Sequence, residues 1–302
     1  MNCPPTVYTI DLHFQGLPGA IASYLVPHAH GAVLVECGPG STLDALQKGI
    51  QSFGFSVTDI SDVLLTHIHL DHAGAAGWLA RQGARIHVHP VGAPHLRNPE
   101  RLLASAERIY GDLMGTLWGE FLSVPDDKLK VPRDQQILEI ENLHFKVIDT
   151  PGHADHHFIY ILDDLCFSGD IGGVRLQNRC HLRLPMPPPE FNLEKWVASL
   201  ERLKSEPIQR IAPTHFGIFS DAGWHLNALE QVLKDTAAWI ENLMPSAPDV
   251  DTINARLSEW SQDRALADGV PEIDLQAYNA ANPTWMSGYG IQRYWNKYRQ
   301  DT

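Results

Sequence analysis

The residues best suited to chemistry lie in one heptapeptide, Thr-His-Ile-His-Leu-Asp-His at positions 66–72. Side chains two residues apart in an extended segment point to the same side, so His67 and His69 can bind one ion. Asp71 and His72 follow where the chain turns into a helix. Because six residues cannot enclose an ion, the heptapeptide predicts one edge of a metal site whose remaining ligands come from elsewhere.

Three later motifs supply candidates for those remaining ligands. They are His153 in Thr-Pro-Gly-His, Asp170 in Ser-Gly-Asp and His215 in Pro-Thr-His. Each of them comes at the end of an apolar run that has the pattern of a strand, and each lies beside a turn signal. The repeated placement of ligand-type residues at predicted strand ends indicates a single site assembled from several parts of the chain.

The elements that must position these residues follow from the apolar pattern. Short buried or alternating runs predict strands at 32–36, 63–66, 86–89, 143–147, 158–162, 165–168 and 208–212. Between 91 and 130 the apolar residues recur at helical spacing, which predicts an inserted helical segment. No strand pattern remains after about residue 221. We therefore expect an α/β core over residues 1–220 and a C-terminal helical appendage over 221–302.

Composition and charge exclude other classes of protein. The 302 residues carry a formal net charge of −13, which repels phosphate backbones and anionic lipids, so we expect no nucleic-acid or membrane partner. The first five residues contain neither a basic run nor an apolar stretch, which predicts no signal peptide and a cytoplasmic location. We expect a small-molecule substrate, and the aromatic residues of the tail form either the core of the appendage or a homodimer surface.

The order of the four motifs resembles the metallo-β-lactamase fold superfamily. The motifs are T-H-x-H-x-D-H, T-P-G-H, S-G-D and a late H-F-G, and they span His67 to His215. The resemblance implies an αβ/βα sandwich, with two sheets face to face, helices outside and metals at one sheet edge. It also implies two divalent metal ions. Zinc is the default, and iron or manganese also suits nitrogen and oxygen ligands.

The resemblance assigns a role to each candidate ligand. The first ion is expected on His67, His69 and His153, and the second on Asp71, His72 and His215. Asp170 is expected to bridge the ions, opposite a bridging water or hydroxide. Two cations sharing a water lower its pKa from 15.7 towards ~7. Asp71 is expected to act in catalysis as well, by orienting the nucleophile and carrying its proton.

Asp170 also narrows the choice within the superfamily. A bridging aspartate is typical of thioesterase, lactonase and phosphodiesterase branches, whereas β-lactamases of this fold have a cysteine or a non-ligand there. We therefore expect a glyoxalase II-like or lactonase-like hydrolase of a small ester-like substrate. Two alternatives stay open: a mononuclear iron persulfide dioxygenase, and a ligand-binding signalling protein of the same fold. The tail shows no obvious Lys and Arg cluster for glutathione, which disfavours glyoxalase II itself.

Two positions depart from the pattern of the family. The family often reads T-P-G-H-x-x-G-H, but here His156 replaces the second glycine, and His157 matches the final histidine. Glu36 stands where an aspartate is common, which puts its bracing of the site in doubt. A bulky imidazole at position 156 reshapes the pocket or contacts the substrate.

Several other residues are candidates for the substrate pocket. His156, His157 and His181 are polar candidates, and Tyr110 and Trp118 on the inserted helix either pack internally or form an apolar lid over the metals. His87 and His89 alternate with apolar residues, so we expect them to be exposed on the polar face of a strand.

Overall fold

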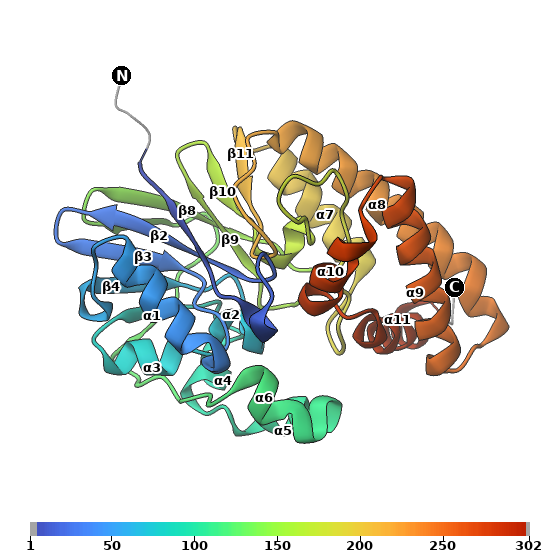
Figure 1. Ribbon diagram of the computed structural model, residues 1–302, viewed down its shortest axis with the longest axis horizontal. Coiled ribbons are helices and arrows are strands. Elements are labelled where there is room, and N and C mark those ends of the chain that lie inside the picture. The colour runs from blue at the N-terminus through green and yellow to red at the C-terminus, as the bar shows by residue number, and fades with distance from the viewer. Residues whose placement is uncertain (1–4, 300–302) are drawn as a thin grey trace.

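Two β-sheets packed face to face form the centre of the molecule (Figure 1). This computed structural model describes residues 5–299, so the first four residues, on which the expectation of a missing signal peptide rests, lie outside the described range. Within it, the first sheet has the order β1 (Tyr8–Asp11), β2 (Ala22–His28), β3 (Gly31–Val35), β4 (Ile60–Leu64), β5 (Arg85–His87) and β6 (Leu129–Lys130). The second has the order β11 (Arg210–Ala212), β10 (Leu165–Phe167), β9 (Phe158–Leu162), β8 (Leu143–Asp149) and β7 (Ile137–Ile140).

Strand β3 shows why the runs of the sequence fold into this sandwich. It pairs antiparallel with β2 and parallel with β4, so it is an interior strand. Val33 and Val35 point into the core between the two sheets, while Leu34 points to the opposite face, and all three are fully buried. An interior strand covered on both faces has to be apolar throughout, which accounts for its unbroken apolar run.

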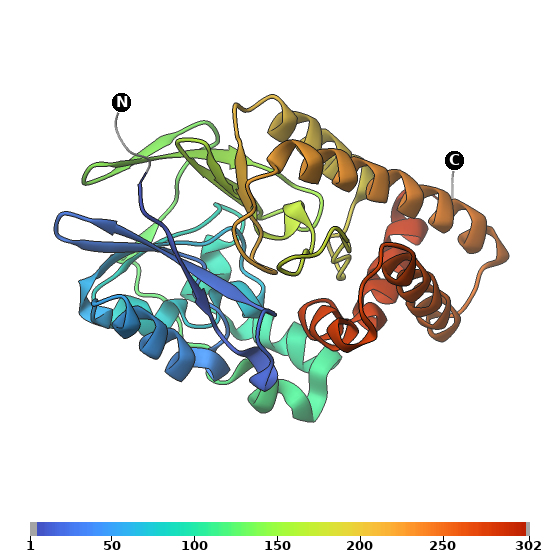
Figure 2. The same cartoon turned by 45° about the horizontal axis from the view of Figure 1, so that its top comes forward.

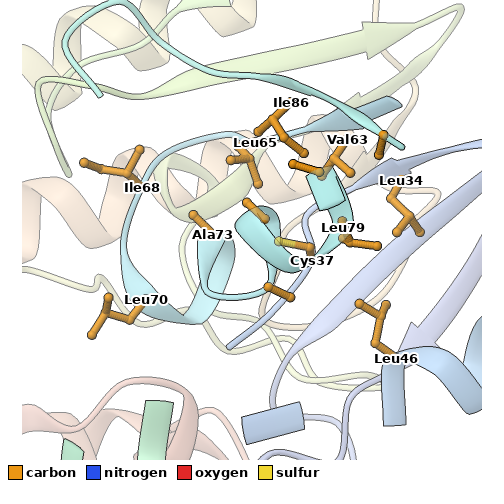
Figure 3. Packing of buried hydrophobic residues seen from close by; sticks show 14 of the residues in the cluster. Leu34, Cys37, Leu46, Val63, Leu65, Ile68, Leu70, Ala73, Leu79 and Ile86 are labelled. Carbon is orange, nitrogen blue, oxygen red and sulfur yellow. The ribbon is translucent and has the colours of Figure 1, made fainter. Parts of the chain in front are cut away.

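Helices cover the outer faces of both sheets (Figures 1 and 2). On the first sheet, α1 (Leu43–Ser52) and α3 (Ala76–Arg81) bury Leu46 and Leu79 against Leu34, Val63 and Ile86, as Figure 3 shows. The short α2 (Leu70–Ala73) lies beside them. On the second sheet, α7 (Leu193–Lys204) and α8 (Ala222–Leu243) do the same with Trp196 and Leu229. The sandwich predicted from the sequence is therefore confirmed.

Two helical segments lie beyond this sandwich. The first contains α4 (Ala93–Arg97), α5 (Glu100–Tyr110) and α6 (Met114–Trp118). The range predicted as helical, 91–130, contains helices only as far as Trp118, and its last two residues form β6, which is too short to give a strand pattern. The second segment contains α9 (Val250–Ala267), α10 (Leu275–Ala281) and α11 (Thr284–Tyr298).

The C-terminal helices pack on the helical layer of the second sheet. Ile291 and Tyr294 of α11 are buried in the same cluster as Trp196 of α7, and the Tyr294 hydroxyl donates to Glu194 Oε1 at 2.6 Å. The tail aromatics therefore divide: Tyr278 and Tyr294 are buried, whereas Trp285 and Tyr289 are partly exposed. Across residues 5–299, no helix combines the length and the apolar character needed to cross a membrane.

Candidate metal centre and substrate cleft

The seven candidate ligands converge between the two sheets because each follows the end of a strand. His67 and His69 follow β4, His153 follows β8, Asp170 follows β10 and His215 follows β11. Asp71 and His72 lie in α2, directly after the β4 loop. The Thr66 carbonyl accepts a 2.7 Å hydrogen bond from the Phe158 amide, which joins the β4 loop to the second sheet beside the ligands.

His67, His69 and His153 form one group, called here the first ligand group. His69 Nδ1 lies 2.9 Å from His67 Nε2 and 2.9 Å from His153 Nε2. All three nitrogens lie within 4.8 Å of one another, close enough to share one ion. Gly152 sets the position of His153: its φ is +147°, and an added Cβ would lie 2.4 Å from the Cα of Trp196. Only glycine allows α7 to approach the turn this closely.

Asp71, His72 and His215 form the second ligand group. Asp71 Oδ2 lies 3.6 Å from His72 Nε2 and 3.5 Å from His215 Nε2. The three ligand atoms again lie within 4.8 Å of one another. The Asp71 side chain is 20% exposed, whereas both imidazoles are buried, so the carboxylate forms the open side of this group.

Asp170 lies between the two groups and presents one oxygen to each. Its Oδ2 lies 3.3 Å from His153 Nε2. Its Oδ1 lies 3.4 Å from the Nε2 atoms of both His72 and His215. In the described part of the chain, Asp170 Oδ1 and these two Nε2 atoms are buried without a hydrogen-bond partner. Buried polar atoms of this kind are costly unless something satisfies them. The residues therefore fit divalent cations in both groups.

The far nitrogens of the imidazoles are held by the protein. Nδ1 of His153 donates to the Pro185 carbonyl at 2.8 Å, and Nδ1 of His215 donates to the Ala20 carbonyl at 2.7 Å. A proton fixed on Nδ1 leaves the lone pair on Nε2, the atom that faces the centre.

Glu36 gives His72 the same support. Its Oε2 accepts from His72 Nδ1 at 3.1 Å, and its Oε1 accepts from the Thr66 amide at 3.0 Å. Only 1% of Glu36 is exposed. The doubt raised by a glutamate at this position was misplaced, because the longer side chain still reaches the histidine and also holds the heptapeptide backbone.

The charge states of the centre suit metal binding. Burial lowers the pKa of all three imidazoles of the first ligand group, so they are neutral at neutral pH. Burial also acts to lower the pKa of His72, but the neighbouring carboxylates outweigh it and raise that pKa. For Asp170, burial is outweighed by the surrounding imidazoles, which hold its pKa well below the usual range. The centre therefore combines ionised carboxylates with nitrogen donors, the set that zinc and iron accept.

A cleft of about 660 Å³ opens onto the centre. His69, Asp71, His153 and Asp170 lie at one end of it. Its walls come from three segments: the α5–α6 region, the Pro185–Glu190 loop and the α10–α11 region. Most of the lining side chains are apolar, which is usual for small-molecule sites.

Of the five candidates for the substrate pocket, three line this cleft: Tyr110, Trp118 and His156. Trp118 stacks on Phe14 at 5.5 Å, and Tyr110 meets Trp118 edge-on at 5.0 Å, so both aromatics pack together and form the wall. His156 Nε2 lies 3.1 Å from Glu190 Oε2.

The other two candidates do not line the cleft. His157 is fully buried, where its Nδ1 lies 2.9 Å from the Thr150 hydroxyl and its Nε2 accepts from the Ile171 amide at 3.4 Å. His181 lies in a separate small cavity and is 2.7 Å from Asp268 of the tail. Both histidines support the structure around the site, and the expectation of a substrate contact fails for them because the sequence does not reveal which side of a loop faces a cleft.

The expectation that His87 and His89 are exposed was wrong. Both are 7% exposed, because carboxylates from other strands meet them: His87 Nε2 lies 2.7 Å from Asp62, and His89 Nε2 lies 3.1 Å from Asp149. Asp62 also accepts two hydrogen bonds of 2.8 Å from Arg85. Burial acts to raise the pKa of Asp62, but these partners outweigh it and lower that pKa.

The fold and this centre define a metal-binding α/β sandwich protein, and comparison with known proteins assigns its family. The family description "Metallo-beta-lactamase superfamily" matches residues 16–215. The match covers well over half of the chain and contains all seven candidate ligands. The chain belongs to the metallo-beta-lactamase superfamily.

Particular relatives are moderately similar. The chain is 28% identical over 195 residues to the metallo-beta-lactamase fold-containing protein ST1585 of Sulfurisphaera tokodaii, covering 62% of this chain and 73% of that protein. It is 32% identical over 197 residues to a hydroxyacylglutathione hydrolase of Xylella fastidiosa, covering 65% and 59% respectively. The match therefore spans less than two thirds of the hydrolase.

One solved structure resembles the whole chain. The crystal structure of ST1585 from Sulfolobus tokodaii superposes with a TM-score of 0.66 at 20% identity, over 96% of this chain and 99% of that one. At this identity the likeness concerns the fold alone. Its coverage extends past residue 215 into the C-terminal helices, so that part of the fold is shared as well.

Proposed function

We propose that the protein is a dinuclear metal-dependent hydrolase of a small ester-like substrate, such as a lactone or a thioester. The observation that carries the proposal is the position of Asp170, whose two oxygens face different ligand groups at 3.3–3.4 Å. A carboxylate in this position can bridge two ions. The similarity to a hydroxyacylglutathione hydrolase, named for the cleavage of an acyl-glutathione, supports this class of reaction.

The first ligand group with Asp170 Oδ2 would hold one ion, and the second ligand group with Asp170 Oδ1 the other. Zinc suits this donor set best, with iron or manganese as alternatives. Two such ions would lower the pKa of a shared water and supply a nucleophile near neutral pH.

Asp71 is the residue best placed to handle the proton of that nucleophile. It lines the cleft and is the more exposed of the two central carboxylates, at 20% against 5% for Asp170. Burial acts to raise the pKa of Asp71, but His72 and His215 outweigh it and lower that pKa, so the carboxylate is ionised at neutral pH. It can therefore accept a hydrogen bond from a water in the cleft and carry away its proton.

The apolar walls keep competing groups away from the reaction. Tyr110 is not a proton acceptor, because burial raises the pKa of its phenol well above the usual range. Its hydroxyl donates to the sulfur of Met286 at 2.8 Å, which joins α5 to α11 across the cleft. The chemistry is thus confined to the end of the cleft where the ligands lie, within a chain that we place in the cytoplasm.

Metal analysis and a substrate panel test the proposal. We expect two ions per chain in protein purified without chelators, and hydrolysis of at least one lactone, ester or thioester. Asp170→Asn keeps the size of the side chain but loses its charge, so it should lose one ion and reduce kcat by at least about 100-fold. Asp251→Asn on exposed α9 is the matched control and should behave as wild type.

Three outcomes would refute this function. One is full activity of Asp170→Asn, which would exclude a bridging role. A second is a single iron per chain with sulfur-dependent oxygen uptake, which would instead indicate a persulfide dioxygenase. The third is the absence of turnover across the whole panel by metal-replete protein.

A further inference from the structure

A second hollow adjoins the cleft and has the opposite chemical character. This groove, of about 610 Å³, lies between α5 and α11 and shares Ile109, Pro188 and Trp285 with the lining of the cleft. A molecule held at the metal centre can therefore extend through the apolar cleft into the groove without leaving the protein surface. We call this hollow the outer groove.

The outer groove concentrates positive charge in a strongly acidic protein. Arg108 of α5 and Arg293 and Lys297 of α11 line it, and no acidic side chain in the described part of the chain does. Across residues 5–299, no carboxylate lies within 4.0 Å of these three cations, although the chain has a net charge of −13. Cations gathered without protein counterions indicate a site for an anionic ligand.

Two aromatic rings lie beside these cations. Trp285 and Tyr289 are one helical turn apart on α11, and they are 38% and 47% exposed. Large aromatic side chains left open beside a basic groove can stack on a planar ring of a ligand. Trp285 is held in place by an edge-on contact with Tyr110 at 5.8 Å.

The protein also fixes the position of one cation. Arg293 Nε donates to the Pro189 carbonyl at 3.0 Å, which holds the guanidinium against the Pro185–Glu190 loop. A guanidinium positioned in advance loses less entropy when it binds an anion, and its planar donors suit phosphate oxygens. Arg293 is therefore the residue whose loss should be felt most.

We infer that the outer groove binds the carrier part of an acyl thioester, and that this carrier is a phosphorylated nucleotide with a thiol arm, as in coenzyme A. The phosphates would lie on Arg108, Arg293 and Lys297, and the base would stack on Trp285 or Tyr289. The arm would run through the cleft and bring the thioester to the metal centre. This inference rests on the proposed function for the reaction, but the groove itself stands on its own residues.

Three thioesters with the same acyl group test the substrate class. The carriers are coenzyme A, glutathione and N-acetylcysteamine, which is uncharged. We expect the highest kcat/KM for the coenzyme A thioester, and a fall of about five- to tenfold for that substrate in Arg293→Gln. The N-acetylcysteamine thioester should be unaffected by the substitution. Arg256→Gln, which removes an exposed arginine from α9, is the matched control and should leave all three rates unchanged.

A binding measurement separates the groove from the reaction. Calorimetry with ADP, which has the ring and the phosphates but no thiol, should give equal affinities for wild type and Arg256→Gln and at least about fivefold weaker binding for Arg293→Gln. Equal ADP binding by the two variants, or equal kcat/KM for the coenzyme A and N-acetylcysteamine thioesters, would overturn the inference. Preference for the glutathione thioester would overturn its nucleotide part. Normal ADP selectivity without turnover of any thioester would refute the hydrolase and leave the groove standing.

Discussion

Replacing Glu36 with glutamine tests how the centre is held in place. Both oxygens of the buried carboxylate accept hydrogen bonds, one from the Thr66 amide and one from His72 Nδ1. An amide has one acceptor and one donor. Because the Thr66 amide can only donate, the glutamine carbonyl has to face it, and the NH₂ group then faces His72. This arrangement favours a proton on His72 Nε2, the atom that faces Asp170 Oδ1.

The size of the effect follows from that exchange of proton positions. Outer partners of metal-binding imidazoles typically change the affinity for the ion by about 10- to 100-fold. This corresponds to about 1.4–2.8 kcal/mol of binding free energy. The loss should fall on the ion of the second ligand group, because the imidazoles of the first group have other partners. Glu36→Asp keeps both acceptors at a shorter reach, so it should lose less.

The assay is a zinc titration in competition with a chromophoric chelator. Wild type should show two binding steps, and Glu36→Gln should show one step near the wild-type value and one weakened by about 10- to 100-fold. Glu139→Gln makes the same chemical change at an exposed position of β7 and should leave both steps unchanged. If the Glu36→Gln variant is folded by circular dichroism and both dissociation constants stay within about twofold of wild type, Glu36 does not brace the site.

Three further predictions concern stability. Removing the metals with a chelator should lower Tm by roughly 5 °C, with recovery on adding zinc; an unchanged Tm in calorimetry would contradict metal binding to the native state. Gly152→Ala should lower the free energy of unfolding by about 2 kcal/mol or more, since its Cβ would clash with Trp196; Gly115→Ala, with open space around it, should be neutral in the same urea titration. Asp62→Asn should cost about 1–3 kcal/mol at pH 7 through its bonds to Arg85. Because the pKa of Asp62 is lowered on folding, the difference from wild type should be complete above pH ~4 and shrink below it; a constant difference down to pH 2 would refute that origin.

The ligands could be predicted from sequence because each is marked locally. Every one of His153, Asp170 and His215 follows a short apolar run and a turn residue, and strand ends are where sandwich sheets present side chains to a shared site. The fold class followed from the same runs. Strand β6 was missed because two residues carry no alternation.

The exposure of side chains was harder to predict, since it depends on partners from distant strands. His87 is buried because Asp62 lies on the neighbouring strand, which alternation along β5 cannot reveal. The outer groove was missed for a similar reason. Arg108 and Arg293 belong to helices far apart in the sequence, so neither the tail nor the insertion shows a basic cluster, and only the packing of α5 near α11 brings the charges together.

The two ligand groups draw on both sheets, and this gives the ions a mechanical role in addition to a chemical one. His69 and His153 are 84 residues apart in the chain, and an ion shared by them would tie the two halves of the sandwich together like a cross-link. A cross-link closing a long loop reduces the conformational freedom of the unfolded chain. Loss of metal should therefore loosen the seam between the sheets first, with faster amide exchange at Phe158, where the β4 loop meets the second sheet, than in the outer helices.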